Sequence, residues 1–366
     1  MRTRILIIAL ALVATACASG ATGTTTTAPP ATTAAPTTTS APTATALAGR
    51  PAIYAYSYKP GDTYSYDISL DQHITLDMTV EGDPGMFETQ DGPTNVDVRT
   101  SVAGSLSYDI AEGPEPDTTA LHISGVFDEF TVEGTIDGEP VSNQDLESGT
   151  VPDLVEVPDT TIILDRHGRP ISVDGEPLPT DLPFFGDPFS MVGGLTSGGL
   201  DKPFGPEFPD RPLAIGDTWT KEQSEDIPST DQTVASTVTY TVTGYDTIDG
   251  YDVAVIDFTS QASGVDIDLG KMFQALFEGF SSMSEEGSTT EIPTIDFVIS
   301  VGDSTGSGTY WFDQEAGLVR QVEQTYTVPI LMHMAVESPE GSGTTDMEMT
   351  VESTVRASLQ PPGTPG

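Results

Sequence analysis

The chain has 366 residues, with 56 acidic side chains against 13 Lys and Arg and a formal net charge of −43. This charge repels nucleic acid and anionic membrane surfaces, so we expect no nucleic-acid partner. A single cysteine excludes an intrachain disulfide, and the fold must therefore be stabilised by its core alone.

The N-terminus has the pattern of a bacterial lipoprotein precursor. Two arginines precede an apolar run (5–13), and small residues lead from it directly into Cys17. The run is too short to span a bilayer and is typical of a secretory signal peptide. We predict a signal peptide (1–16), export, and a diacylglyceryl cysteine at Cys17 that carries a further acyl chain such as palmitate. Because Ala14 stands where lipobox sequences prefer leucine, an ordinary secreted protein with a stray thiol is the alternative.

The segment after the cysteine is predicted to be a tether (17–50). It consists mostly of Thr, Ala and Pro, and its first charged residue is Arg50. Such a composition cannot bury enough apolar surface to fold and behaves as a spacer that spans on the order of 30 Å. We therefore expect an acidic domain held off the extracytoplasmic face of a membrane by a lipid anchor.

From residue 51 onward the pattern predicts β-strands. Between Tyr64 and Val80 every even position is apolar except Gln72, and a second long alternating run covers 318–336. Strict alternation is typical of antiparallel strands with one dry face. One amphipathic helix is predicted at 269–280, where apolar residues recur at helical spacing. The predicted fold is therefore mainly β (a β-rich α+β protein) with curved sheets or half-barrels.

Two landmarks recur in the same order and suggest an internal repeat. A Gly-Asp-Thr-aromatic opening occurs at 61–64 and at 216–219, and an Asp-to-Gly hairpin loop occurs at 165–168 and 313–317. Such turns are common, so chance similarity is the alternative. The predicted organisation is a first β half-domain (51–175), a Pro/Gly/Phe-rich connector (176–212) whose aromatics pack against a sheet, a second β half-domain (213–359) and a disordered tail (360–366).

The chain lacks the motifs of common enzymes. It has no Gly-x-Ser-x-Gly elbow and no His-Glu-x-x-His, and its four histidines lie far apart in sequence. The acidic residues are scattered, and no stretch matches the calcium loop of EF-hands. We therefore predict a non-enzymatic protein with no catalytic residues, no cofactor and no metal site, and we read the acids as a solvated surface.

Methionines in the last long strands suggest an apolar cavity. If the hairpin turns around 340–341, Met334 lies opposite Met347 and Met332 opposite Met349. Methionine is adaptable and suits variable apolar partners. With the helix and the connector, the predicted cavity lining is Met332, Met334, Met347, Met349, Leu276, Phe277, Phe280, Phe184 and Phe185. Gap-filling in an ordinary core is the alternative.

The repeated openings, the hairpins and the lipidated start resemble a bacterial lipoprotein family of unknown function, over roughly 56–359. More distantly, the stretch from Tyr310 to Arg320 is similar to the aromatic-x-Asp-x-x-x-Gly-Leu strand pair of lipoprotein carriers of the LolA, LppX and LprG type. The resemblance implies a half-barrel around an acyl-chain cavity. We expect an envelope lipoprotein that binds an apolar ligand or a protein partner on a concave sheet face. The alternatives are a structural lipoprotein with filled cores and, more remotely, an envelope hydrolase.

Overall fold

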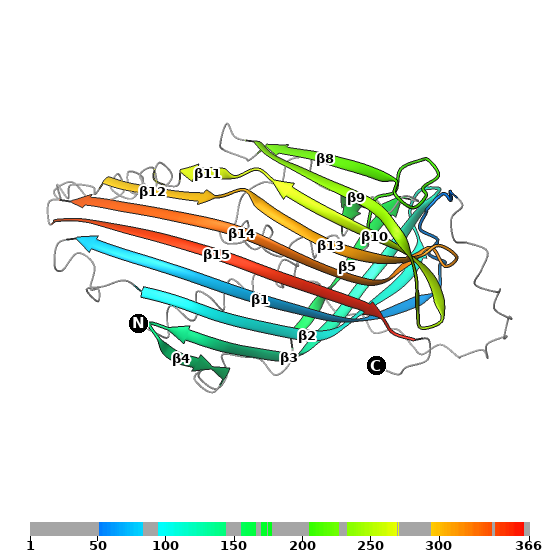
Figure 1. The fold of residues 1–366 in the computed structure, drawn as a ribbon, viewed down its shortest axis with the longest axis horizontal. Helices are drawn as coiled ribbons and strands as arrows, with labels where there is room; N and C mark the ends of the chain where they lie inside the picture. Colours follow the sequence, from blue (N-terminus) through cyan, green and yellow to red (C-terminus); the bar gives the residue numbers. More distant parts are fainter. Residues whose placement is uncertain are drawn as a thin grey trace, which may run out of the picture.

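The computed structural model describes residues 51–82, 94–143, 155–165, 170–173, 175–177, 205–226, 233–268, 270, 294–338 and 341–361. In these residues the chain forms fifteen strands of one antiparallel sheet (Figure 1). The predicted mainly-β antiparallel fold is confirmed. The predicted signal peptide, Cys17 and the tether up to Arg50 lie outside the described residues, and so does the predicted helix 269–280 apart from Gly270.

The strands fall into two groups along the chain. The first group is β1 (Thr63–Gly82), β2 (Thr94–Glu112), β3 (Thr118–Ile136), β4 (Glu139–Ser142), β5 (Val155–Asp165), β6 (Pro170–Val173) and β7 (Glu176–Pro177). The second group is β8 (Thr218–Asp226), β9 (Thr233–Ile248), β10 (Tyr251–Ala262), β11 (Val265–Asp268), β12 (Thr294–Val301), β13 (Ser304–Asp313), β14 (Leu318–Ser338) and β15 (Gly341–Leu359).

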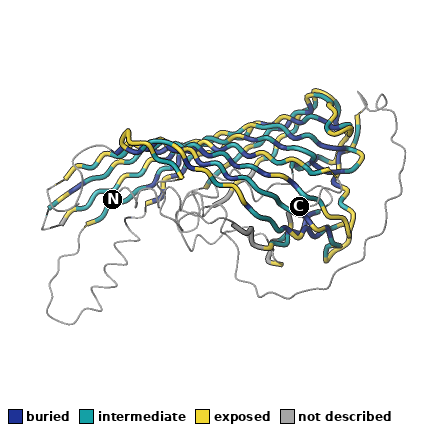
Figure 2. Tube along the Cα trace, turned by 90° about the horizontal axis from the view of Figure 1, so that it is seen from below, coloured by how far each residue is buried: buried dark blue, intermediate teal, exposed yellow. Residues whose placement is uncertain are grey.

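The order across the sheet is β7-β6-β5-β3-β2-β1-β15-β14-β13-β10-β9-β8. Off this path, β4 pairs with β3, and β12 pairs with β11 and β14. The pairing of β1 with β15, in which Ile74 lies opposite Val351, joins the first and last long strands. The two predicted halves thus share one continuous sheet, which is strongly curved (Figure 2).

The turns before β1 and β8 are built in the same way. Gly61 and Gly216 have φ values of 94° and 88°, which glycine adopts readily. The Gly61 N–H donates to the Ile110 carbonyl at 2.8 Å, and the Gly216 N–H donates to the Val242 carbonyl at 2.7 Å. In both turns the next residue, an aspartate, donates its N–H three residues back at 3.0 Å.

The second pair of landmarks also has equivalent surroundings. The strand β5 ends at Asp165 and β13 ends at Asp313. Both strands meet the following strand with a register shift immediately before that aspartate, at Ile163/Leu164 and at Trp311/Phe312. The two halves therefore share local geometry at both sequence landmarks, whereas descent from a duplication remains a prediction.

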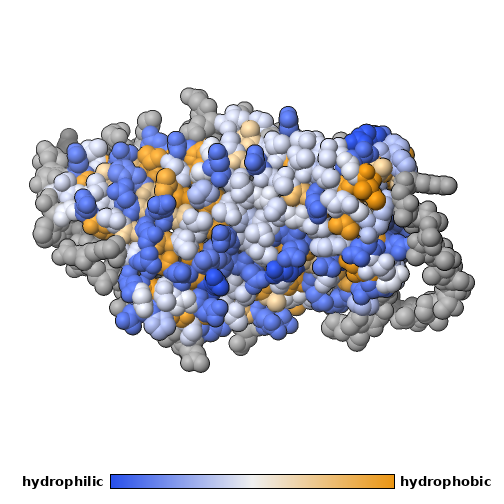
Figure 3. All heavy atoms as spheres, in the orientation of Figure 1, coloured by the Kyte–Doolittle hydropathy of each residue, from blue (hydrophilic) through white to orange (hydrophobic). Residues whose placement is uncertain are grey.

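Alternation along the long strands separates a buried face from an exposed one. On β14, Ile330 is fully buried whereas the adjacent Leu331 is 53% exposed. On β1, the buried Leu70 and Ile74 share the even-numbered face. The sheet is curved (Figure 2), and we call this buried side its concave face. Seen from the opposite side, hydrophilic and intermediate side chains predominate (Figure 3).

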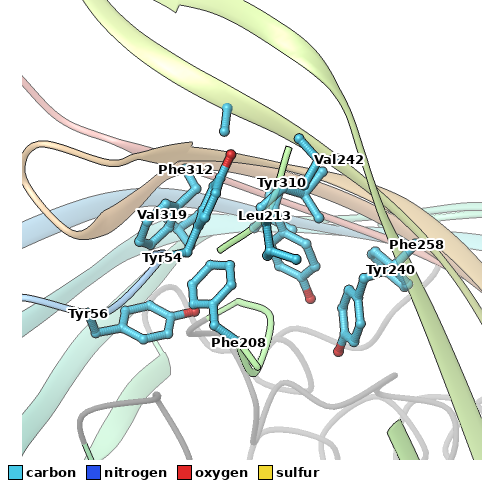
Figure 4. Packing of buried hydrophobic residues seen from close by; sticks show 13 residues of the cluster. Tyr54, Tyr56, Phe208, Leu213, Tyr240, Val242, Phe258, Tyr310, Phe312 and Val319 are labelled. Carbon is cyan, nitrogen blue, oxygen red and sulfur yellow. The ribbon is translucent and has the colours of Figure 1, made fainter. Parts of the chain in front are cut away.

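Two non-strand segments, 51–58 and 205–213, pack on the concave face beside β13. Ala52 and Leu213 exchange backbone hydrogen bonds of 2.9 and 2.7 Å. Phe208 lies with its ring centroid 4.7 Å from that of Phe312, and Tyr54 contacts both rings (Figure 4). Phe208 thus packs against the sheet, as predicted for the connector aromatics.

Candidate binding face

Three methionines lie side by side across three neighbouring strands of the concave face. Met78 of β1 is opposite Met347 of β15, and Met347 is opposite Met332 of β14. All three side chains are half-buried. In the next row toward the middle of the sheet, Met349 and Ile330 are buried. This methionine row (Met78, Met347 and Met332) therefore marks the place where the apolar face becomes accessible.

The hairpin between β14 and β15 differs from the predicted register. Ser338 pairs with Gly341, and this pairing sets the register of the two strands; residues 339–340 lie outside the described residues. As a result Met334 lies opposite Thr345, and Met349 lies opposite Ile330. The predicted pairs Met334–Met347 and Met332–Met349 are therefore wrong. A shift of two residues keeps every side chain on the same face, which is why the face itself is as predicted.

A polar belt crosses the concave face farther along the same strands. Gln72 of β1 lies opposite Thr100 of β2 and opposite Ser353 of β15, and all three are buried. The Gln72 Nε2 donates to Ser353 Oγ at 3.3 Å. Among the described residues, Gln72 Oε1 and Thr100 Oγ1 are buried without a hydrogen-bond partner. Each such group costs about 1–3 kcal/mol of stability.

The aromatic end of the concave face is filled with side chains. Tyr54, Leu213 and Phe312 are at most 1% exposed. Burial raises the pKa of Tyr56 and Tyr310 well above the ordinary value of tyrosine, and nearby tyrosine hydroxyls raise both values further. The close-up shows these rings interleaved (Figure 4). This end contributes to the core. The candidate binding surface is therefore the other end of the concave face, which carries the methionine row and which we call the methionine end.

The outer face carries a groove of about 620 Å³ that is lined by residues of β1, β2, β3, β14 and β15. Its lining includes the small residues Ser69 and Ala103 and the charged residues Asp128 and Arg356. Asp128 is an extra residue in the pairing of β3 with β2, and such a bulge redirects side chains. Arg356 pairs with carboxylates of adjacent strands, so its charge is already balanced.

The described histidines are engaged in local interactions on the exposed side of the sheet. The Nε2 of His73 lies 2.8 Å from Asp97 Oδ1, and the Nδ1 of His333 lies 2.6 Å from Asp346 Oδ1. His122 hydrogen-bonds Thr161. Within the described ranges, no group of three or more His, Cys, Asp or Glu side chains is arranged to hold a metal ion.

Five of the nine predicted cavity residues lie outside the described residues: Leu276, Phe277, Phe280, Phe184 and Phe185. The four predicted methionines lie together on the concave face, and Met78 joins them through the pairing of β1 with β15. The alternation in β1 contained Met78, but local sequence gave no sign that β1 and β15 are neighbours. In the part of the chain that the structure describes, no helix is long and apolar enough to cross a membrane.

No family model matches the chain, and no curated protein matches it. Among solved structures, OccK1 (OpdK) of Pseudomonas aeruginosa has 8% identity over 80% of this chain and 98% of its own length, with a TM-score of 0.18. An outer membrane channel from Pseudomonas putida F1 has 8% identity over 86% of this chain and 98% of its own, with a TM-score of 0.14. Similarity this low supports neither a shared fold nor a shared function, so the function is inferred from the residues of the chain itself.

Proposed function

We propose that this chain is a lipid-anchored protein of the bacterial cell envelope that binds an apolar molecule on its concave sheet face. The observation that carries the proposal is the accessible apolar surface around the methionine row. Apolar side chains that a fold leaves partly exposed at neighbouring positions are typical of binding surfaces. The anchor part rests on the signal-like start and on Cys17, the single cysteine of the chain.

The two faces of the sheet suit different roles: the outer face contacts solvent, and the concave face binds the ligand. The outer face carries acidic side chains, among them Asp67, Asp128 and Glu129 around the groove. Its charge keeps the domain soluble and away from anionic lipid headgroups. The concave face carries apolar side chains at the methionine end, where an acyl chain or another flexible apolar group finds adaptable contacts. The aromatic end is filled, so we place the ligand at the methionine end.

A structural role with filled cores is the second candidate, because the aromatic cluster is fully packed. Native mass spectrometry of the full-length protein purified from bacterial envelopes separates the two. Ligand binding predicts an added mass beyond that of the covalent anchor, which organic extraction removes and identifies. A Cys17→Ala protein secreted into the medium serves as the control, because it lacks the anchor but keeps the sheet. Absence of a non-covalent lipid in both preparations, together with no uptake of added lipid, would favour the structural role.

A further inference from the structure

The methionines of the described residues lie on one part of one face. Five of the ten in the sequence lie on the concave face of β1, β14 and β15: Met78, Met332, Met334, Met347 and Met349. Strands favour β-branched and aromatic residues, and the buried rows of the same face use mainly Val, Ile and Leu. The methionines therefore depart from the local preference, and such departures are expected at functional sites.

The register places three thioethers in adjacent positions. Met347 is the middle member, with Met78 and Met332 directly opposite on its two neighbouring strands. Adjacent strands lie about 4.8 Å apart, so the three Cα atoms span about 10 Å. Each side chain has three rotatable bonds, which lets three sulfurs converge on one small ion above Met347. The three side chains are half-buried, so an ion can reach them from solvent.

The surroundings favour a soft ion of low charge. Ile299 lies beside Met332 and Thr94 lies beside Met78, so the row is extended by uncharged residues. The carboxylates of Asp77 and Asp346 occupy alternate positions, on the opposite face of the sheet. Neutral thioether donors in apolar surroundings select Cu(I) over the harder divalent ions, which prefer nitrogen and oxygen ligands. The strongly negative protein raises the local concentration of any cation.

We propose that the methionine row is a Cu(I) site with three thioether ligands. The spacing of histidine, cysteine and carboxylate side chains predicted no metal site, and the thioethers of methionine are not part of those patterns. The proposal goes beyond binding of an apolar molecule and depends on a different property of the same side chains. An acyl chain requires their apolar surface, whereas Cu(I) requires their sulfur. Substitution by leucine keeps the first property and removes the second.

The test is an anaerobic titration with Cu(I) against a chromophoric Cu(I) chelator, using the full chain in a Cys17→Ser background so that the thiol does not contribute. We expect the parent protein to withdraw one Cu(I) per chain from the chelator. We expect at least tenfold weaker binding for Met347→Leu, and none for the combination with Met78→Leu and Met332→Leu. Met349→Leu is the matched control: it alters a buried methionine of the neighbouring row and should bind as the parent does.

Circular dichroism verifies that each variant is folded, and Met347→Leu provides a single-site test should the triple variant not fold. Ag(I) serves as a redox-inert probe of the same site and should show the same order of affinities. Failure of the parent protein to compete for Cu(I) would overturn the proposal, and so would equal binding by the parent and the folded Met347→Leu variant. Neither result bears on lipid binding, because the leucine variants keep the apolar surface.

Discussion

The side chain of Arg320 donates to the Asp313 carboxylate, with Nε at 2.8 Å and Nη2 at 2.7 Å from Oδ2. Arg320 is the extra residue at the register shift between β13 and β14, which turns it toward the hairpin loop. Its guanidinium also stacks over the ring of Tyr251 at 3.3 Å. The other carboxylate oxygen accepts the backbone N–H groups of Glu315 and Ala316. One buried carboxylate thus fixes both the loop and the start of β14.

Replacement of that carboxylate should therefore be costly. We expect Asp313→Ala to lower the free energy of unfolding by about 3–5 kcal/mol, because it leaves the largely buried Arg320 without its partner. Asp217→Ala is the matched control in the turn before β8. Asp217 accepts the Ala214 N–H and pairs with Arg211, but both charged side chains are at least 40% exposed. Its cost should be about 1 kcal/mol or less. Urea unfolding measures both, and similar costs would contradict the central role of Asp313.

The two faces of β14 can be tested with neighbouring residues. We expect Ile330→Ala to destabilise the fold by about 2–5 kcal/mol, since it removes a fully buried side chain from the concave face. Leu331→Ala removes a similar volume from the exposed side and should change stability by less than about 1 kcal/mol. Chemical denaturation compares them. Equal effects would mean that the concave face is not the buried one.

The alternation in these same strands predicts which face is buried but not how the strands pair. Alternation from Tyr64 to Val80 predicts the buried face of β1, because side chains of a strand alternate with period two. The same period explains the error in the β14–β15 hairpin: a two-residue shift leaves the alternation unchanged, so the pattern cannot choose between registers. Met78 and Met347 are far apart in sequence, and only the antiparallel pairing of β1 with β15 brings them together. The site therefore depends on long-range pairing that local patterns do not contain.

Buried tyrosines should make the fold sensitive to alkali. Burial raises the pKa of Tyr66 and Tyr310 well above that of an unfolded tyrosine, and it raises the pKa of Tyr64 to about 12. Above pH 10 the unfolded chain loses these protons while the folded chain keeps them, so stability is full below pH 10 and falls as the pH rises further. Tyrosinate absorbance and circular dichroism should change together above pH 10. Ionisation of all tyrosines near pH 10 with the sheet intact would contradict this burial.

The proposed anchor makes a separate prediction. Cys17→Ala removes the sulfur that would carry the diacylglyceryl group, so the protein should move from the membrane fraction to the soluble exported fraction. Metabolic labelling with palmitate should mark the parent chain and not the variant. The Cys17→Ala chain should keep the thermal unfolding of the parent, because the described strands lie between Thr63 and Leu359 and do not include residue 17. Membrane retention of the variant would show that another feature of the chain attaches it.

Binding of a fluorescent acyl probe tests the concave-face assignment most directly. The measurement compares Met332→Glu with Leu331→Glu, which introduce the same charge at adjacent positions on opposite faces of β14, after circular dichroism shows both to be folded. Because a carboxylate in the methionine row disfavours contact with an acyl chain, we predict that Met332→Glu lowers probe affinity at least tenfold. Leu331→Glu should bind as the parent protein does. No binding by the parent, or equal binding by both variants, would contradict the account.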